Sequence, residues 1–271
     1  MGTSIPWPWP AIPGKGPNQY ISQAYVFGKP LAGVPLRIDA GKFFSSVGAE
    51  VPQSYLDFNA SRSLLFWFGS PLYHVGLRAS MPVTEHFTAG LQLLSGCNTV
   101  TGAHGHQTVA ATAAWAGKKW GFSQLYMGCN ERLVGSGWRQ LSDSVLTYRL
   151  SNLVTAYGEI LAAVEKRPAP GYDRWYGWAA ASRFSPAAKW SLSPRVEWYN
   201  DPDGATTGVA QHLAELSLTA EYRPARVAIA RLEYRHDWSD RPFFHTTADG
   251  VDSRRGHALI AGITLLLSQG L

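Results

Sequence analysis

Hydrophobic and polar residues alternate one by one along most of this chain. In the stretch 190–198 the apolar side chains take alternate positions, namely Trp190, Leu192, Val196 and Trp198. The positions on the other face are Ser191, Ser193, Arg195 and Glu197. A period of two residues is typical of a strand with one apolar and one polar face, and helical periodicity is weak nearly everywhere. The pattern therefore predicts an all-β protein.

Thirteen stretches are predicted as strands, each near the roughly 9 to 11 residues that a tilted strand needs to cross a bilayer. They lie near residues 19–27, 34–42, 72–80, 85–94, 107–116, 119–127, 142–150, 153–164, 174–184, 188–199, 212–222, 226–236 and 256–268. No run reaches the ~18 to 20 apolar residues of a membrane-spanning helix. Strands can cross a bilayer as a closed barrel, because closure pairs every backbone group. We therefore expect residues 1–271 to form one antiparallel transmembrane β-barrel domain.

The predicted connections alternate between short and long. The short ones lie at 28–33, 81–83, 117–118, 151–152, 185–187 and 223–225. The long ones lie at 43–71, 95–106, 128–141, 165–173, 200–211 and 237–255. Outer-membrane barrels have short turns on the periplasmic side and long loops outside, a pattern that a soluble sandwich has no reason to keep. The alternation indicates a barrel of the bacterial outer membrane.

The count of predicted strands is odd, because the first strand enters a short turn and the last follows a long loop. Bacterial single-chain barrels close with an even number, so we expect 14 to 16 strands in the complete barrel. The N-terminus shows neither the basic nor the apolar region of a signal peptide. We interpret the chain as shortened at its N-terminus, with the Pro-rich residues 1–18 as the remains of an outer loop. An overlooked strand is the other interpretation.

Composition narrows the class further. Charged residues make up 16% of the chain, below the roughly 25% of soluble domains. Aromatic residues near strand ends suggest girdles at the membrane interfaces, as at Trp115, Trp120, Trp175, Tyr176, Trp190, Trp198 and Trp238. The net charge is +5, but the basic residues are scattered and no nucleic-acid-binding motif accompanies them, so nucleic acid is not an expected partner. Motifs of catalysis such as GxSxG, HExxH and the P-loop are absent from the sequence, so we expect neither an enzyme nor a metal or other cofactor.

Two segments resemble a known family. The first is Gly41-Lys-Phe-Phe-Ser-Ser-Val-Gly48 with Glu50, Asn59, Ser61-Arg-Ser-Leu-Leu-Phe66, Pro71, His74, Gly76 and Arg78. The second is Arg231-Leu-Glu-Tyr-Arg-His-Asp-Trp-Ser239 with Pro242-Phe-Phe244. Together they resemble the putative β-barrel porin-2 family, the OmpL-like porins, over roughly residues 20–271. The resemblance implies an outer-membrane porin for small hydrophilic solutes. The family is usually longer at its N-terminus and usually ends on an aromatic residue, whereas this chain ends on Leu271.

The charged residues on the polar strand face are the first candidates for a functional role. A charge that faces lipid at the midplane costs about 2–4 kcal/mol, so these side chains are predicted to face the lumen. The predicted pore-lining residues are Arg37, Asp39, His74, Arg78, Arg149, Arg195, Glu197, Arg231, Glu233 and Arg235. Rings of arginine favour anions. The alternative is that these charges pair across strands and hold the wall together.

Residues 43–70 form the one long stretch that breaks the alternation. An inward fold would narrow the lumen and bring Lys42, Glu50, Asp57 and Arg62 into the passage. The alternatives are an outer loop packed on the rim, or one more strand. Cys97 and Cys129 both follow upward strands, so a disulfide between neighbouring outer loops is predicted, with two free thiols as the alternative.

The function predicted from the sequence is passive diffusion of small hydrophilic solutes, with a preference for anions, across the bacterial outer membrane. Outer-membrane lipid and small polar solutes are the expected partners. Two alternatives remain at this stage. One is a plugged structural or adhesive barrel that binds a partner through its outer loops, and the other is a soluble lipid-binding barrel.

Overall fold

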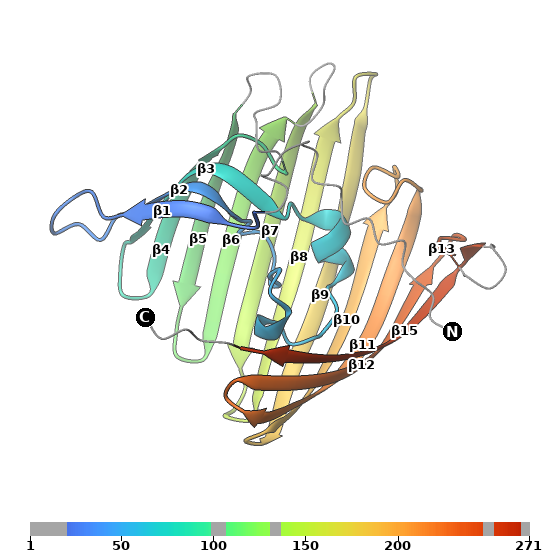
Figure 1. Ribbon diagram of the computed structural model, residues 1–271. Coiled ribbons are helices and arrows are strands. Elements are labelled where there is room, and N and C mark those ends of the chain that lie inside the picture. Colours follow the sequence, from blue (N-terminus) through green and yellow to red (C-terminus); the bar gives the residue numbers. More distant parts are fainter. Residues whose placement is uncertain (1–20, 99–106, 131–136, 246–251, 267–271) are drawn as a thin grey trace.

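The computed structural model describes residues 21–98, 107–130, 137–245 and 252–266. Within them, thirteen strands form one antiparallel sheet in sequence order, and the sheet curls around a concave face (Figure 1). Its strands are β1 (Ala24–Gly28), β2 (Arg37–Phe44), β3 (Tyr73–Pro82), β4 (Phe87–Leu94), β5 (Thr108–Ala116), β6 (Trp120–Asn130), β7 (Trp138–Arg149), β8 (Val154–Lys166), β9 (Tyr172–Ala187), β10 (Trp190–Asp201), β11 (Gln211–Ala225), β12 (Ala228–Ser239) and β15 (Arg255–Leu265). The all-β class and the number of strands predicted from the alternation are confirmed.

Two further strands of two residues each lie in the connection between β12 and β15. They are β13 (Phe244–His245) and β14 (Asp252–Ser253), and they pair with each other rather than with the large sheet. In the large sheet the described pairings leave β1 and β15 as its two edges. No helix among the described residues is long and apolar enough to span a membrane.

The two faces of each strand differ in polarity as the alternation predicts. In β10 the side chains of Ser191, Ser193, Arg195 and Glu197 are buried on the concave side, while Trp190 and Leu192 are exposed on the convex side. The same alternation of buried and exposed positions runs through β11 and β12. One aromatic residue departs from the expected girdle, because Trp175 is fully buried on the concave side and its Nε1 donates to the carbonyl of Gly69 at 3.3 Å.

From β3 onward short and long connections alternate along the sheet, as predicted, whereas the first connection, residues 29–36, is longer than the short turn predicted there. The turns at 117–119, 150–153, 188–189 and 226–227 lie at the lower end of Figure 1, and the turn at 83–86 lies to their left. The longer connections 45–72, 95–107, 131–137, 167–171, 202–210 and 240–254 join the strands at their other ends. The predicted boundaries differ from the observed ones by a few residues, and Cys129 lies inside β6 instead of in the following loop.

A pair of glycines lets four strands, β1 to β4, approach closely near the start of the sheet. Gly41 of β2 is in register with Gly76 of β3, with φ of 136° and 153°. A Cβ at Gly41 would lie 2.3 Å from the carbonyl oxygen of Ala24, and one at Gly76 would lie 2.2 Å from that of Leu93. Any larger residue would therefore push β1 and β4 away, which explains glycine at both positions.

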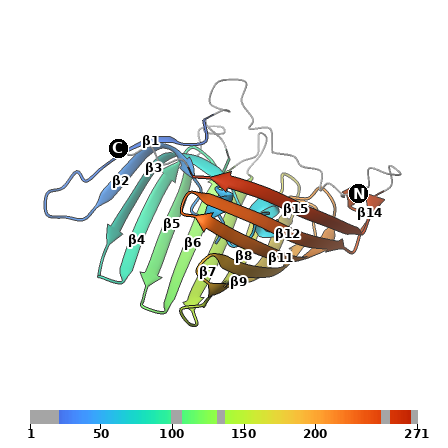
Figure 2. The same ribbon diagram turned by 60° about the horizontal axis from the view of Figure 1, so that its bottom comes forward.

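The connection between β2 and β3, residues 45–72, lies inside the curve of the sheet (Figures 1 and 2). We call it the inserted segment. It contains one 3-10 turn, η2 (Ser54–Leu56), and one π-helical turn, η3 (Leu65–Gly69). Its apolar side chains Val47, Leu64 and Leu65 join a buried cluster with residues of the surrounding strands, namely Leu94, Met127, Leu141, Leu161, Trp175, Tyr199 and Leu213. The segment is thus packed against the sheet instead of continuing the strand pattern.

Candidate functional site

Most of the buried charged residues of the concave face lie on one side of it. We call the concave face of β7 to β12 the charged wall. Its buried ionisable side chains are Asp143, Glu159, Glu165, Arg195, Glu197, Asp201, Glu215, Glu221, Arg231, Glu233, Arg235 and Asp237. The strands between β3 and β7 are different, because β4, β5 and β6 contain no charged residue. We call their concave face the neutral wall.

Arg195 is the centre of the charged wall. Its side chain is 0% exposed, and its Nη1 lies 2.6 Å from Glu50 Oε1 of the inserted segment. Its Nε lies 3.0 Å from Glu215 Oε2 and 3.7 Å from Glu197 Oε1. Its remaining donors reach the carbonyl and hydroxyl of Ser61 at 3.1 and 2.9 Å. One guanidinium therefore joins two strands to two points of the inserted segment.

Carboxylates of the wall accept hydrogen bonds from backbone amides of the inserted segment. The donor–acceptor pairs are Gly48 to Asp143 at 2.8 Å, Ala49 to Glu159 at 2.9 Å, Ala60 to Glu233 at 2.7 Å and Leu64 to Glu197 at 2.7 Å. These amides are in an irregular segment, so they have no ladder partner of their own. The carboxylates satisfy them, because a buried N–H without a partner is costly.

Arginines of the wall donate in the opposite sense, to carbonyls of the inserted segment. Arg183 and Arg231 both donate to the carbonyl of Asp57, at 2.8 and 2.9 Å. Arg235 donates to the carbonyl of Arg62 at 2.6 Å. Because side chains of β7 to β12 bind both the amides and the carbonyls of the inserted segment, these strands hold the backbone of the segment in place.

Asp57 and Arg62 pair with each other inside the segment. Arg62 Nε lies 3.1 Å from Asp57 Oδ2, although its N–H donates to the carbonyl of Val51 at 2.8 Å. Burial raises the pKa of Asp57 to about 7 against the opposing effect of Arg62, and the nearby Glu50 also raises it. Asp57 is therefore a titratable group near neutral pH within the segment.

The predicted pore-lining residues fall into two groups. Arg195, Glu197, Arg231, Glu233 and Arg235 are buried and bound to the inserted segment or to one another. Arg37 and Arg78 both pair with Asp39, each at 2.6 Å, near the start of the sheet. Arg149 is exposed at the end of β7, on the same side of the strand as Asp143.

Two predicted residues lie elsewhere than expected. His74 is fully buried, and its ring nitrogens contact the carbonyl of Gly96 at 3.1 Å and the hydroxyl of Ser45 at 3.0 Å, so it joins β3 to two connections. Lys42 lies within β2 and not in the inserted segment, and its Nζ is 4.4 Å from the ring centre of Tyr73. Of the four residues predicted for a constriction, Glu50, Asp57 and Arg62 lie in the segment.

Sequence reasoning left out Asp143, Glu159 and Arg183. Their strands carry apolar residues on the concave face as well, such as Leu141 and Leu161, which blurs the difference between the faces. Each of the three is in phase with those buried neighbours along its strand. The alternation of these strands places all three charged residues on the concave face. A charge at such a position could have identified them from the sequence.

A disulfide links two elements beside the neutral wall. Cys97, just after β4, pairs with Cys129 of β6 across 32 positions of sequence, with their Cα atoms 6.3 Å apart. No group of three or more His, Cys, Asp or Glu side chains suited to a metal occurs in the part of the chain that the structure describes.

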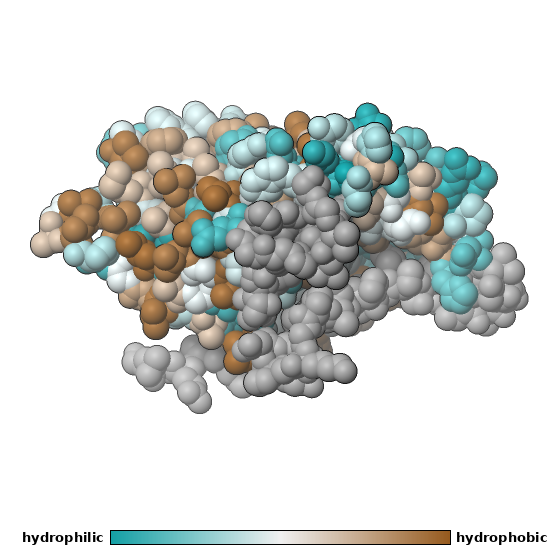
Figure 3. Space-filling model, turned by 90° about the horizontal axis from the view of Figure 1, so that it is seen from above, coloured by the Kyte–Doolittle hydropathy of each residue, from teal (hydrophilic) through white to brown (hydrophobic). Residues whose placement is uncertain are grey.

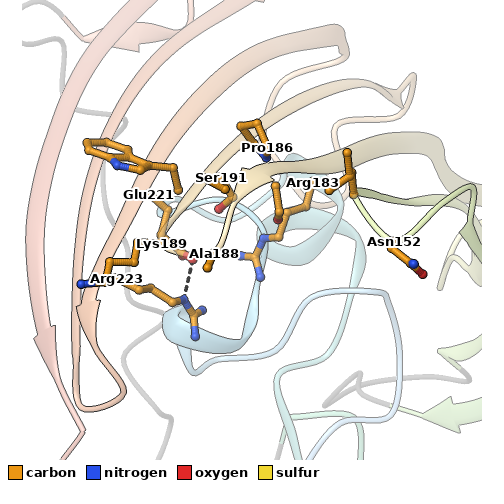
Figure 4. A pocket seen from close by; sticks show the side chains of 12 residues that line it. Asn152, Arg183, Pro186, Ala188, Lys189, Ser191, Glu221 and Arg223 are labelled. Atoms are coloured by element: carbon orange, nitrogen blue, oxygen red, sulfur yellow. Dashed lines mark hydrogen bonds and ion pairs between the residues drawn. The ribbon is translucent and has the colours of Figure 1, made fainter.

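Two cavities lie at opposite ends of the sheet. One of about 160 Å³, on the long-loop side, is lined by aromatic residues together with Arg139 and Cys97. The other, of about 380 Å³, lies among the turns at the opposite end and is lined by Arg183, Lys189, Ser191, Glu221 and Arg223 (Figure 4).

Seen from above, hydrophobic residues gather on the left of the molecule and hydrophilic ones on the right (Figure 3).

Comparison with known proteins identifies the fold. The model of the family described as putative beta-barrel porin-2, OmpL-like, matches residues 13–265, which confirms the resemblance seen in the sequence. An anion-selective porin from Comamonas acidovorans has a similar structure, with a TM-score of 0.63 and 10% identity, over 84% of this chain and 74% of that one.

Two further solved structures are similar. The outer membrane channel DcaP of Acinetobacter baumannii aligns with a TM-score of 0.61 and 10% identity, over 84% of this chain and 71% of that one. OmpT of Vibrio cholerae aligns with a TM-score of 0.60 and 12% identity, over 90% and 81%. At these identities the likeness shows a shared fold. A search of curated proteins gave no match.

Proposed function

The chain belongs to the putative β-barrel porin-2, OmpL-like family, the porins of the bacterial outer membrane, and from that membership we propose that it passes small hydrophilic solutes. From the charges of its concave face we further propose a preference for anions. The convex face, with its exposed apolar side chains, is proposed to contact lipid. The concave face is proposed to line the passage, which the inserted segment narrows.

The observation that carries the anion preference is a difference in exposure within the ion pairs. The side chains of Arg37 and Arg78 are 39% and 26% exposed, whereas that of their shared partner Asp39 is 4% exposed. The same holds for Arg223 and Arg183, at 40% and 21%, around Glu221 at 4%. In both clusters two arginines reach water and the carboxylate does not, while Arg231, the third partner of Glu221, is buried. The charge presented to a solute is therefore positive, which attracts anions and repels cations.

The buried charges have a different proposed role. Arg195, Glu197 and Glu233 are bound to the inserted segment and excluded from water, so they position the segment instead of contacting the solute. We therefore assign a pairing role to the buried charges at the centre of the concave face and a selectivity role to the exposed arginines.

Reconstitution into planar bilayers tests the proposal. We expect single-channel conductance, and a reversal potential in a potassium chloride gradient that reports a chloride-to-potassium permeability ratio above one. Properly folded protein without conductance would contradict the pore, and a ratio below one would contradict the anion preference.

Neutral variants show which charges set the ratio. Arg78→Gln and Arg223→Gln remove a cation from each exposed cluster, and we expect each to lower the permeability ratio. Lys118→Gln, in the β5–β6 turn, is the matched control, since it removes one positive charge outside both clusters. An equal change in the control would show that net charge alone sets the ratio.

The bonds of the inserted segment also favour a second candidate, a plugged barrel whose outer loops bind a partner. Six amides and several carbonyls of the segment are bound to the charged wall, as a plug would require. A wild-type protein that does not conduct, together with conduction after residues 46–70 are replaced by a short Gly-Ser linker, would favour the plug. Conduction by both would favour the porin.

A further inference from the structure

The cavity of about 380 Å³ at the short-turn end is the site of this inference. Three parts of the chain enclose it: the turn between β7 and β8, the β9–β10 hairpin and the end of β11. It is larger than the roughly 30 Å³ share of one liquid water. The cavity therefore lies at the short-turn mouth of the proposed passage.

The charges lining this cavity are mostly positive. Arg183, Lys189 and Arg223 line it together with a single carboxylate, that of Glu221. Both oxygens of Glu221 are bound, because Arg223 Nε donates to Oε1 at 2.7 Å and Arg231 Nε donates to Oε2 at 2.6 Å. Figure 4 shows Arg183 and Arg223 at the same cavity, with a dashed line from Arg223 to Glu221. The cavity therefore presents excess positive charge.

Two buried donors at this cavity have no hydrogen-bond partner among the described residues. They are Arg183 Nε and Ser191 Oγ. Arg183 is held in place by other contacts, since its Nη2 donates to the carbonyl of Asp57 at 2.8 Å and its guanidinium lies 4.8 Å from the ring centre of Phe58. Ser191 is 8% exposed. Most buried polar atoms are paired, so two unpaired donors at one cavity call for an acceptor.

We propose that this cavity binds a small oxyanion, such as phosphate or the carboxylate of a dissolved solute. Guanidinium N–H groups and a hydroxyl offer donors in several directions, which suits a group with several oxygens. The inference rests on the proposed function, because it places a binding step for the preferred anions at the short-turn mouth. A lipid headgroup carries the same phosphate chemistry, so the experiment separates the two sources.

The first measurement is block of the chloride current by inorganic phosphate, added to each side of the bilayer in turn. We expect saturable block from the short-turn side. Ser191→Ala removes one neutral donor and Arg223→Gln one charged donor, and each is expected to raise the half-blocking concentration about tenfold. Arg226→Gln is the matched control, because it removes a positive charge from the neighbouring β11–β12 turn without lining the cavity, and it is expected to change the value less than twofold.

The second measurement is calorimetric titration of inorganic phosphate into folded protein in maltoside micelles, which contain no phosphate. Binding there that Ser191→Ala weakens supports the proposal even if the protein does not conduct, so the two proposals fail separately. Conductance without phosphate binding, or equal binding by wild type, Ser191→Ala and Arg223→Gln, would overturn it. Binding of phosphatidylglycerol but not of inorganic phosphate would overturn the assignment to a dissolved anion.

Discussion

Strands β4, β5 and β6 contain no charged residue, whereas the concave face of β7 to β12 buries twelve acidic and basic side chains. The neutral wall carries small side chains toward its lower end, namely Thr88, Gly90, Thr112, Ala114, Gly121 and Ser123. The charged wall carries both arginines and carboxylates on β10, β11 and β12, and along β12 they alternate from Arg231 to Asp237. The charged wall therefore needs partners for its buried charges, and the neutral wall does not.

Buried charges need partners, and the inserted segment supplies them. Removal of an ionic group from water costs several kcal/mol unless hydrogen bonds and an opposite charge replace the solvent. Glu50 and the backbone of residues 48–64 provide those bonds to the charged wall. The wall and the segment thus stabilise each other.

The neutral wall has no charged side chain that needs such a partner. The hydrogen bond from Gln92 to Ser46 that joins it to the segment is long, at 3.4 Å. A disulfide ties its two outer strands instead. The inserted segment is therefore hydrogen-bonded mainly to β7 to β12 and only weakly to β4 to β6. We expect solutes to pass between the segment and β4 to β6, along the small side chains of those strands.

The largest expected effect comes from removing the centre of the charged wall. Arg195→Met leaves Glu50, Glu197 and Glu215 without their shared cation, and breaking such a buried network is expected to cost about 3–5 kcal/mol. Equilibrium urea unfolding in lipid vesicles measures it. Arg78→Met is the matched control, because Arg78 is partly exposed and Asp39 keeps Arg37, so a loss of about 1 kcal/mol or less is expected. Equal losses would remove the distinction between the two arginines.

The next effect concerns the neutral wall. The Cys97–Cys129 bond closes a loop across 32 positions, which the chain-entropy model values at about 3–4 kcal/mol. We expect the double variant Cys97→Ser, Cys129→Ser to lose that much unfolding free energy while amide exchange at Ala60 and Leu64 keeps its protection relative to global unfolding. Early exchange at those two amides would show that the walls are coupled.

Asp57 gives a smaller, pH-dependent effect. Because burial raises its pKa to about 7, the folded protein holds a proton that the unfolded chain releases near pH 4. Its contribution to stability is therefore complete below about pH 4 and is lost as the pH rises toward about 7, by at most about 1.4 kcal/mol per pH unit. The difference in unfolding free energy between wild type and Asp57→Asn, followed from pH 5 to 7, measures it. A pH-independent difference would contradict the raised pKa.

The strands and their faces could be predicted from the sequence because alternation is a local property. Leu192 and Val196 are apolar and in phase, and any lipid-facing strand requires that pattern. The segment 153–164 was harder, since Leu161 and Glu159 share the concave face and its polarity is mixed. A face that packs against protein need not be polar, so alternation alone cannot assign it.

The partners of the charges could not be predicted from the sequence. Glu50 and Arg195 are 145 positions apart, and nothing local relates them. The sequence placed Arg195 and Glu197 on the lumen side, but pairing along the strand was as consistent as contact with solute. The tertiary path of the inserted segment decides between these, because it determines which charges are covered and which reach water.

The smallest expected effect tests where solutes pass. Thr112→Glu adds one carboxylate to the neutral wall, at a position in register with Gly90 of β4 and Leu125 of β6. A unit charge a few ångströms from a passing ion in water interacts with it by about 1 kcal/mol, so the chloride-to-potassium permeability ratio is expected to fall about two- to fivefold. Thr112→Gln is the isosteric neutral control and is expected to leave the ratio unchanged. If Thr112→Glu also leaves it unchanged while Arg223→Gln lowers it, solutes do not pass along β4 to β6, and the passage follows the charged wall.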